Sequence, residues 1–244
     1  MPVYNAERWI GQCIESIISQ DYPYFDLIVI DDCSTDLTWE YIKYYDIYSI
    51  RNKERKGALA NIVNGIDRIG SDIIVTVDGD DYLPDNKVFS YLESFYTSDI
   101  WMTYGSFLPV SLKYKNTCQP FDKIRVPCEA GYLVDTSTTP EAYRKSGLWV
   151  TSHLRTFRKW LWDRIDPDDL KEDGQYYDVA CDLAFMYPMI EMAGDHCKFI
   201  DRIMYMYNDL NPNCNGTVKK DQQLETAKRI QEKQCYARVD GNIL

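Results

Sequence analysis

Apolar residues in the first half of the chain alternate between a helical spacing and short continuous runs. After Asn5, which can cap a helix, they recur every three or four residues, at Trp9, Ile10, Cys13, Ile14, Ile17 and Ile18. The run over 25–30 then predicts a strand buried on both faces, as in a parallel sheet. Further along, the pattern predicts in turn a helix over 37–45, a strand over 48–51, a helix over 59–69 and a strand over 73–77. This alternation is typical of an α/β sheet with right-handed crossovers.

The second half is less regular. Its pattern predicts helices over 87–97, 180–193 and 219–236, and strands over 101–107, 199–200 and 203–207. Gly194 is the expected stop of the second of these helices. Between them, residues 109–146 contain several prolines and read as loops, and a loop of this length is usually functional.

Acidic residues stand directly after two of the predicted buried strands. Asp31-Asp32 follows one, and Asp78-Gly79-Asp80-Asp81 follows the other. Ligands of open α/β sheets bind beyond the carboxyl ends of the strands. These clusters therefore mark the expected binding edge.

The second cluster has the chemistry of a cation and phosphate site. Its carboxylates repel one another, and Mg²⁺ or Mn²⁺ would relieve this repulsion by taking oxygen ligands from them and from a substrate's phosphates. Gly79 permits tight backbone geometry or the close approach of a ligand. An ordinary acidic turn is the alternative, since Asp and Gly are turn formers.

Composition and charge limit the class of protein to which the chain can belong. The chain has 244 residues, 45% of them hydrophobic, enough for one large domain. No apolar run reaches the roughly 18 residues of a membrane span, and the start lacks signal-peptide order, so a cytoplasmic location is expected. A net charge of −11 argues against a nucleic-acid partner. The oligomeric state stays open, a homodimer included.

Eight cysteines occur without a C-x-x-C pair, which argues against a zinc site and favours buried reduced thiols. A disulfide remains conceivable only between Cys118 and Cys128, which lie in the predicted loop region.

Read in order along residues 1–207, the motifs resemble those of family 2 glycosyltransferases, which have the GT-A fold. The matching segments are Pro2-Val3-Tyr4-Asn5-Ala6-Glu7, Ile28 to Asp36 with its paired aspartates, Val77 to Asp81, and His153-Leu154-Arg155 followed by Asp182. The resemblance implies a mixed, mostly parallel sheet flanked by helices. It also implies an inverting, metal-dependent transferase that moves a sugar from a nucleotide-sugar donor, UDP-linked, to a hydroxyl of a glycan or glycoconjugate.

The resemblance also implies a role for each matching residue. Pro2, Tyr4 and Glu7 would line the base and ribose pocket, and Asp32 would accept a hydrogen bond from the base. Asp78 would lie near the ribose and the Mn²⁺ or Mg²⁺ ion, Asp80 would be the principal ligand, and His153 would add an imidazole ligand. Asp182 would be the general base.

Several residues of these motifs have a plain structural alternative. Asp182 lies near a predicted helix start, where the helix dipole favours a carboxylate, but it could simply cap the helix. His153 could be merely structural, which is the favoured reading for His196. Arg155 and Arg158 could offset phosphate charge or lie on a solvated face.

Other residues carry weaker expectations. Lys56 is a weaker candidate for donor contact in a run that reads as surface charge. The aromatic residues Trp149, Trp160, Trp162, Tyr176 and Tyr177 could stack on a sugar, although core packing is commoner.

Family members usually carry four to six apolar residues before P-x-Y-N, whereas here that first strand is apparently truncated. We expect a GT-A domain over 1–210, with a donor half over about 1–108 and an acceptor half over about 109–210, and a polar, helical tail over 211–244. The competing functions are a catalytically weak nucleotide-sugar-binding module and a nucleotidyltransferase. The latter would ordinarily need a glycine- and basic-rich phosphate loop near the N-terminus, which is not seen.

Overall fold

The computed structural model of the protein describes residues 1–96, 99–111, 144, 151–212 and 219–239. The strands are β1 (Pro2–Val3), β2 (Ile28–Asp31), β3 (Tyr48–Arg51), β4 (Ile73–Thr76), β5 (Met102–Gly105), β6 (Leu108–Pro109), β7 (Arg155–Arg158), β8 (Lys171–Glu172), β9 (Gln175–Tyr176), β10 (Cys197–Ile200) and β11 (Met206–Tyr207). The α-helices are α1 (Ile10–Ile18), α2 (Thr38–Ile42), α3 (Ala58–Ile66), α4 (Val88–Glu93), α7 (Lys159–Trp162), α8 (Cys181–Ala193) and α10 (Lys220–Glu232).

Seven of these strands form a mixed sheet in two hydrogen-bonded parts, while β6 with β11 and β8 with β9 form separate two-stranded sheets. One part has the order β1-β2-β3 and is parallel, and the other has the order β10-β5-β7-β4. In the second part β5 and β10 are parallel, and β7 runs antiparallel to both of its neighbours. The N–H of Gly79 donates to the carbonyl of Pro2 over 3.1 Å, which joins the two parts at the end of β4. The predicted mostly parallel sheet is confirmed.

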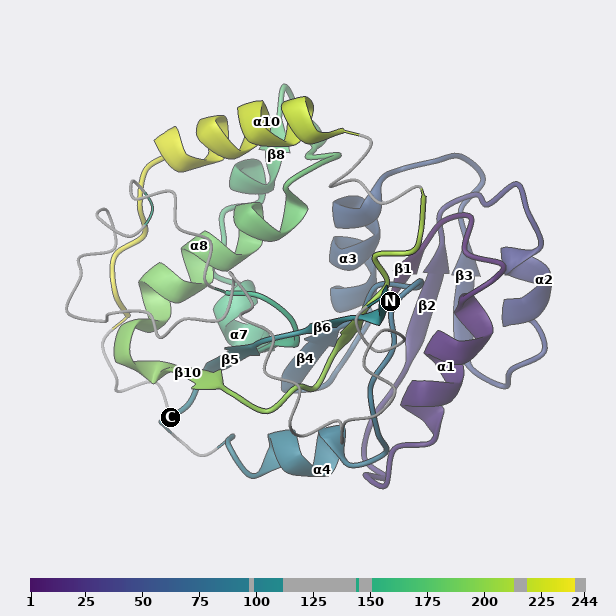
Figure 1. Ribbon diagram of the computed structural model, residues 1–244. Coiled ribbons are helices and arrows are strands. Elements are labelled where there is room, and N and C mark those ends of the chain that lie inside the picture. Colours follow the sequence, from purple (N-terminus) through teal and green to yellow (C-terminus); the bar gives the residue numbers. More distant parts are fainter. Residues whose placement is uncertain (97–98, 112–143, 145–150, 213–218, 240–244) are drawn as a thin grey trace.

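Helices cover both faces of this sheet (Figure 1). Apolar residues of α3, α7 and α8 pack with β5 and β7 into the largest core cluster. Residues of α1 and α4 pack on the other face with Val77 and Leu83, and α2 packs against α1. The sheet is therefore buried on both faces, as its continuous apolar runs predicted.

Most of the predicted elements are present, and several are shorter than expected. The strand over 48–51 and the helix that ends before Gly194 have the predicted bounds to within a residue. The helices expected over 37–45 and 87–97 are confined to α2 and α4. The expected loop region lies largely outside the described residues, together with Trp149, Cys118 and Cys128.

The strand β7 was not predicted, and it decides the position of the site. It pairs with β4 in antiparallel register, so Arg155 lies opposite Thr76 at the carboxyl end of β4. The first residue of an antiparallel strand meets the last residue of its partner. Residues 153–155 therefore reach the same edge of the sheet as the acidic turn.

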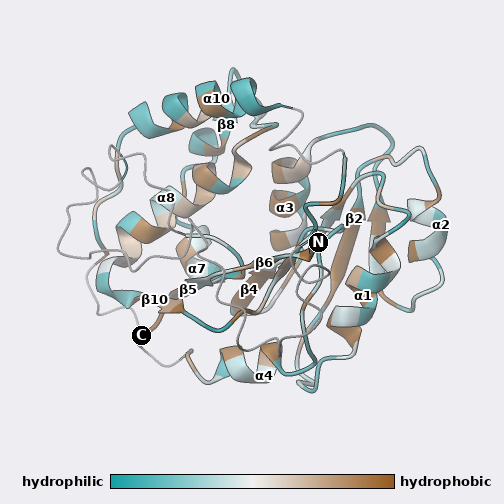
Figure 2. Ribbon diagram, in the orientation of Figure 1, coloured by the Kyte–Doolittle hydropathy of each residue, from teal (hydrophilic) through white to brown (hydrophobic). Residues whose placement is uncertain are grey.

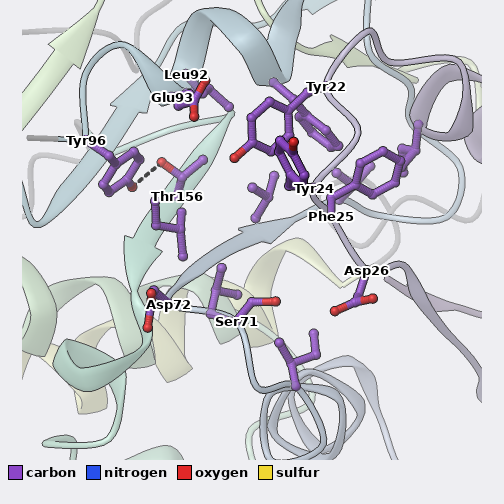
Figure 3. A pocket seen from close by; sticks show the side chains of 17 residues that line it. Tyr22, Tyr24, Phe25, Asp26, Ser71, Asp72, Leu92, Glu93, Tyr96 and Thr156 are labelled. Carbon is purple, nitrogen blue, oxygen red and sulfur yellow. Dashed lines mark hydrogen bonds between the residues drawn. The ribbon is translucent and has the colours of Figure 1, made fainter.

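The first strand is short: β1 pairs with β2 only at Pro2↔Ile30 and Val3↔Asp31. A cavity of about 370 Å³ is lined by residues at the beginning of β4, by residues of the 22–26 segment and by α4. Figure 3 shows tyrosines and Phe25 on one side of it and Ser71 and Asp72 on the other. It lies at the edge where these strands begin, so it is not part of the acidic edge.

In the C-terminal part, Lys220–Glu232 form the helix α10, which is predominantly hydrophilic (Figure 2). This helix is not wholly exposed, because its Ile230 is buried in the largest core cluster. Arg144 and Glu191 form a buried ion pair with N–O distances of 2.6 Å, and Arg144 also donates to carbonyls at the end of α10. This ion pair fixes α10 to α8.

Within the described residues, no helix has both the length and the apolar character needed to cross a bilayer. The cysteines at 13, 33, 181, 197 and 235 are free thiols, and Cys13 is buried, as predicted for reduced cysteines.

Candidate active site

The acidic turn follows β4 and is held tightly against β1. A Cβ atom on Gly79 would lie 2.5 Å from the Cβ of Val3, closer than side chains can approach. Only glycine therefore fits between the carboxylates of Asp78 and Asp80 in this geometry. The turn presents these two side chains at the edge predicted from the sequence.

Burial raises the pKa of each carboxylate of the turn, and neighbouring carboxylates add to this for Asp78 and Asp81. Burial, followed by the charges of Asp80 and Asp182, raises the pKa of Asp78 to about 6, while the Arg155 charge opposes this. Burial also raises the pKa of Asp80, and burial with the charges of Asp80 and Asp78 raises that of Asp81. A divalent cation would relieve this repulsion, so the donor set fits Mg²⁺ or Mn²⁺.

Arg155 links the acidic turn to the beginning of α8. Its guanidinium pairs with Asp182 at 3.0 Å and lies 3.0 Å from Nε2 of His153. Arg155 lies opposite Thr76, two residues before Asp78, so its ion pair with Asp182 lies at the edge of the sheet that carries the acidic turn. Residues from three distant parts of the sequence meet at this edge, whereas the roles that the resemblance implies for them stay predictions.

Asp182 lies in the first turn of α8 but does not cap the helix. The cap position is Ala180, which has a left-handed backbone with φ of 52°. The Asp182 carboxylate accepts from the N–H of Leu183 over 3.1 Å, and its pair with Arg155 directs it toward the acidic edge. The cap alternative is therefore wrong, whereas the role of general base stays a prediction.

His153 is buried and neutral. Burial, followed by the nearby charge of Arg155, lowers the pKa of its imidazole well below the ordinary value. The ring stacks on Tyr205 with 4.3 Å between centroids, and Nδ1 has no hydrogen-bond partner among the described residues. Arginine can only donate, so Nε2 accepts from Arg155 and the neutral ring carries its proton on Nδ1; in this tautomer a metal could bind only at Nε2, in place of Arg155. The described residues also contain no cluster of three potential metal-binding side chains, so Asp78, Asp80 and His153 are not preassembled as one.

Asp32 organises the loop that leads into α3. Its Oδ1 accepts from Nδ2 of Asn52 at 2.9 Å and from the N–H of Lys56 at 2.8 Å, and its Oδ2 accepts from the N–H of Gly57 at 2.9 Å. A carboxylate has about four acceptor positions, so these bonds leave room for one more donor. Asp32 thus has a structural role at this edge of the sheet, and its contact with a nucleotide base stays a prediction.

We expect Asp32→Asn to lower the free energy of unfolding by about 2 kcal/mol at pH 7, because the amide cannot accept from all three donors. Burial raises the pKa of Asp32, but the nearby side-chain amide of Asn61 and the hydrogen bonds from Lys56, Asn52 and Gly57 outweigh it, and the net shift is downward.

A lowered folded-state pKa means that ionised Asp32 stabilises the fold above its unfolded-state pKa of about 3.9 and loses this effect as the pH falls through the folded-state value. Urea unfolding of both proteins at several pH values measures this. The difference should be largest near pH 7 and narrow below about pH 4, and an equal difference at every pH would contradict the assignment.

Tyr4 and Arg55 form a flat platform beside Asp32. The Arg55 guanidinium lies 4.1 Å from the centre of the exposed Tyr4 ring, and its Nε lies 3.9 Å from Oδ2 of Asp32. From the sequence, Arg55 belongs to the charged run around Lys56 that was predicted to lie on the surface, so this contact was not predicted. Lys56 is exposed and contributes its backbone N–H to Asp32.

Glu7 and Pro2 contribute to the structure of this edge of the sheet. Oε2 of Glu7 accepts from the N–H of Leu37 over 3.0 Å, and Pro2 is buried in β1. Their implied place in a base and ribose pocket stays a prediction.

The other histidine and most of the described aromatic group have structural positions. His196 stacks on Trp101 with 3.8 Å between centroids, as its structural reading predicted. Trp162 and Tyr177 are buried in the core, with Trp160 and Tyr176 packed against it.

Comparison with solved structures shows which fold this is. The protein superposes on the Staphylococcus aureus TarS fragment 1–349 in complex with UDP-GlcNAc with a TM-score of 0.68 and 18% identity, covering 94% of this chain and 63% of the other. It superposes on the mannosyltransferase PcManGT of Pyrobaculum calidifontis, in complex with GDP-Man and Mn²⁺, with a TM-score of 0.62 and 17% identity, covering 96% and 64%. The fold is the GT-A fold of glycosyltransferases.

Residues 1–148 match the family described as "Glycosyl transferase family 2", which is more than half of the chain. The chain belongs to glycosyltransferase family 2.

Curated relatives agree with this assignment. An uncharacterized glycosyltransferase of Haemophilus influenzae is 32% identical over 114 residues, which cover 44% of this chain and 45% of that protein. The poly(ribitol-phosphate) β-N-acetylglucosaminyltransferase TarS of Staphylococcus aureus is 30% identical over 92 residues, which cover 34% and 16%. The matched part of the chain spans less than half the length of these relatives.

Proposed function

We propose that the protein is an inverting glycosyltransferase that moves a sugar from a UDP-linked donor to an acceptor hydroxyl of a glycan or glycoconjugate. The observation that carries this is the register of β4 and β7, which places Arg155 and its ion-pair partner Asp182 at the carboxyl edge of the sheet, where β4 leads into Asp78. Family membership and the UDP-GlcNAc complex of TarS support a nucleotide-sugar donor.

The donor would occupy the edge between the Tyr4–Arg55 platform and the acidic turn. The flat Tyr4 ring can stack on a nucleobase, and the remaining acceptor position of Asp32 can take a base N–H. Asp78 and Asp80 would hold Mn²⁺ or Mg²⁺, with His153 as a further candidate ligand. When bound, such an ion supplies positive charge for the departing diphosphate.

Transfer would proceed by a single displacement. The acceptor oxygen forms its bond to the anomeric carbon while the bond from that carbon to the diphosphate breaks, and Asp182 takes the hydroxyl proton. Arg155 holds the Asp182 carboxylate at the site through their ion pair. The acceptor is assigned to the half of the domain over about 109–210, most of whose first forty residues lie outside the described part.

The test is a screen of nucleotide sugars with and without Mn²⁺, which follows both UDP release and calorimetric binding. Metal-stimulated UDP release from one donor, increased by a glycan acceptor, is the expected result. Binding of UDP without any turnover would favour the alternative of a catalytically weak binding module. Binding of no nucleotide sugar would overturn both.

A further inference from the structure

The acidic turn is held in place by a segment from the other end of the domain. This segment, which we name the turn clamp, comprises residues 205–211. Its contacts reach every carboxylate residue of the turn, although more than a hundred residues separate the two in sequence. The apolar pattern predicted a strand over 203–207, but neither it nor the motifs predicted these contacts with the acidic turn.

The clamp begins with contacts to the backbone. The hydroxyl of Tyr205 accepts from the N–H of Asp78 over 3.1 Å. Tyr82 and Met206 then exchange two backbone hydrogen bonds of 3.2 and 2.9 Å. Both ends of the turn are therefore fixed before any side chain is considered.

Asn208 shapes the next part of the clamp. Its N–H donates to the buried carboxylate of Asp81 over 2.7 Å, and its side-chain amide donates to the carbonyl of Asp80 over 3.1 Å. Its Oδ1 accepts from the N–H of Leu210 at 3.2 Å, and its carbonyl accepts from the N–H of Asn211 at 3.3 Å. These bonds form a tight turn that brings residue 211 to the acidic edge.

Asn211 contacts the predicted principal metal ligand directly. Its Nδ2 donates to Oδ2 of Asp80 over 2.7 Å. A neutral amide fixes the plane of a carboxylate without cancelling its charge, whereas a Lys or Arg at this place would compete with a cation. Carboxylates that bind metals are characteristically oriented by such hydrogen bonds.

We propose that Asn211 is a positioning residue that orients the Asp80 carboxylate for a divalent cation, with Asn208 fixing the turn that presents it. This inference rests on the proposed function, since it assigns the metal ligand to Asp80. It adds a residue of the C-terminal segment to a site whose other members come from β1 to α8.

The experiment titrates Mn²⁺ into the protein with UDP present and follows free Mn²⁺ by electron paramagnetic resonance. Asn211→Ala should raise the Mn²⁺ dissociation constant by about 10- to 100-fold. Asn211→Ser, which keeps a hydroxyl donor, should have a smaller effect. The melting temperature, and UDP affinity measured in EDTA, should stay close to those of the unaltered protein.

Asn64→Ala is the matched control, because it also removes one side-chain amide contact, the 3.0 Å bond that Asn64 accepts from Arg68 on the surface. It should leave Mn²⁺ binding unchanged. A lower melting temperature with unchanged Mn²⁺ affinity in Asn211→Ala would show a merely structural role, and tighter Mn²⁺ binding would show that Asn211 competes with the ion. Either result overturns the inference. If the unaltered protein binds no Mn²⁺, the metal site of the proposed function fails instead.

Discussion

Replacing Asp182 by asparagine is expected to lower the turnover number for sugar transfer by about 10²- to 10⁴-fold, the usual contribution of a general base. The amide has nearly the same shape and keeps an oxygen that can accept from Arg155, whose bond to Asp182 is 3.0 Å long. It cannot, however, take the proton of the acceptor hydroxyl. Because Asp182 acts on the acceptor side, donor binding should be preserved.

The measurement is steady-state transfer with the donor found by the screen, together with calorimetric UDP binding. A loss in the turnover number with UDP affinity unchanged within about twofold is the expected pattern for a group that acts in the transition state. Asp163→Asn is the control, since it removes a carboxylate from another ion pair, with Lys159, on the surface. Unchanged turnover in Asp182→Asn would remove the general base from the proposed mechanism.

The first half of the fold was predictable because apolar residues in regular patterns mark its buried strands and helix faces. β2 and β4 are short continuous runs, and the helices between them carry regular apolar stripes. Asp31-Asp32 stands at the end of β2 and Asp78 two residues after the end of β4, so predicting the strands also located these residues. Hence the positions of Asp32, Asp78 and Asp80 at one edge followed from the sequence.

β7 was not predictable in the same way, because its burial is achieved with polar residues. It reads Arg-Thr-Phe-Arg, with only Phe157 as an apolar signal. Thr156 is buried, and its hydroxyl forms hydrogen bonds with the hydroxyls of Thr103 and Tyr96, which come from distant parts of the chain. Such pairings are long-range and leave no local period, so the place of Arg155 emerged only from the structure.

The contacts around the acidic turn were missed for a related reason. Asn208 and Asn211 lie in a polar segment that resembles any surface turn, and only the three-dimensional fold brings them to Asp80 and Asp81. The weak expectation for Lys56 likewise gave no sign that its backbone, rather than its side chain, holds Asp32. A sequence motif can indicate the reacting groups, but not the groups that orient them.

Replacing Asp80 by asparagine should weaken Mn²⁺ binding in the presence of UDP at least as strongly as loss of a supporting residue does, by about 10- to 100-fold or more. Transfer should fall by about 10²- to 10³-fold, because the charge that develops on the departing diphosphate loses its stabilising partner. The variant keeps an oxygen that can accept from Asn211, so the turn should stay folded. The same Mn²⁺ titration and transfer assay measure both effects.

Asp85→Asn is the matched control for this loss of charge. Asp85 lies just beyond the acidic turn and forms a partly exposed ion pair of 2.8 Å with Arg202, so its replacement should change neither Mn²⁺ affinity nor transfer by more than about twofold. The contrast between two aspartates five positions apart separates a specific ligand from the general negative field of this acidic chain. If Asp80→Asn and Asp85→Asn lowered Mn²⁺ affinity equally, the cation would be held by that field rather than by the turn, and Asp80 would not be its ligand.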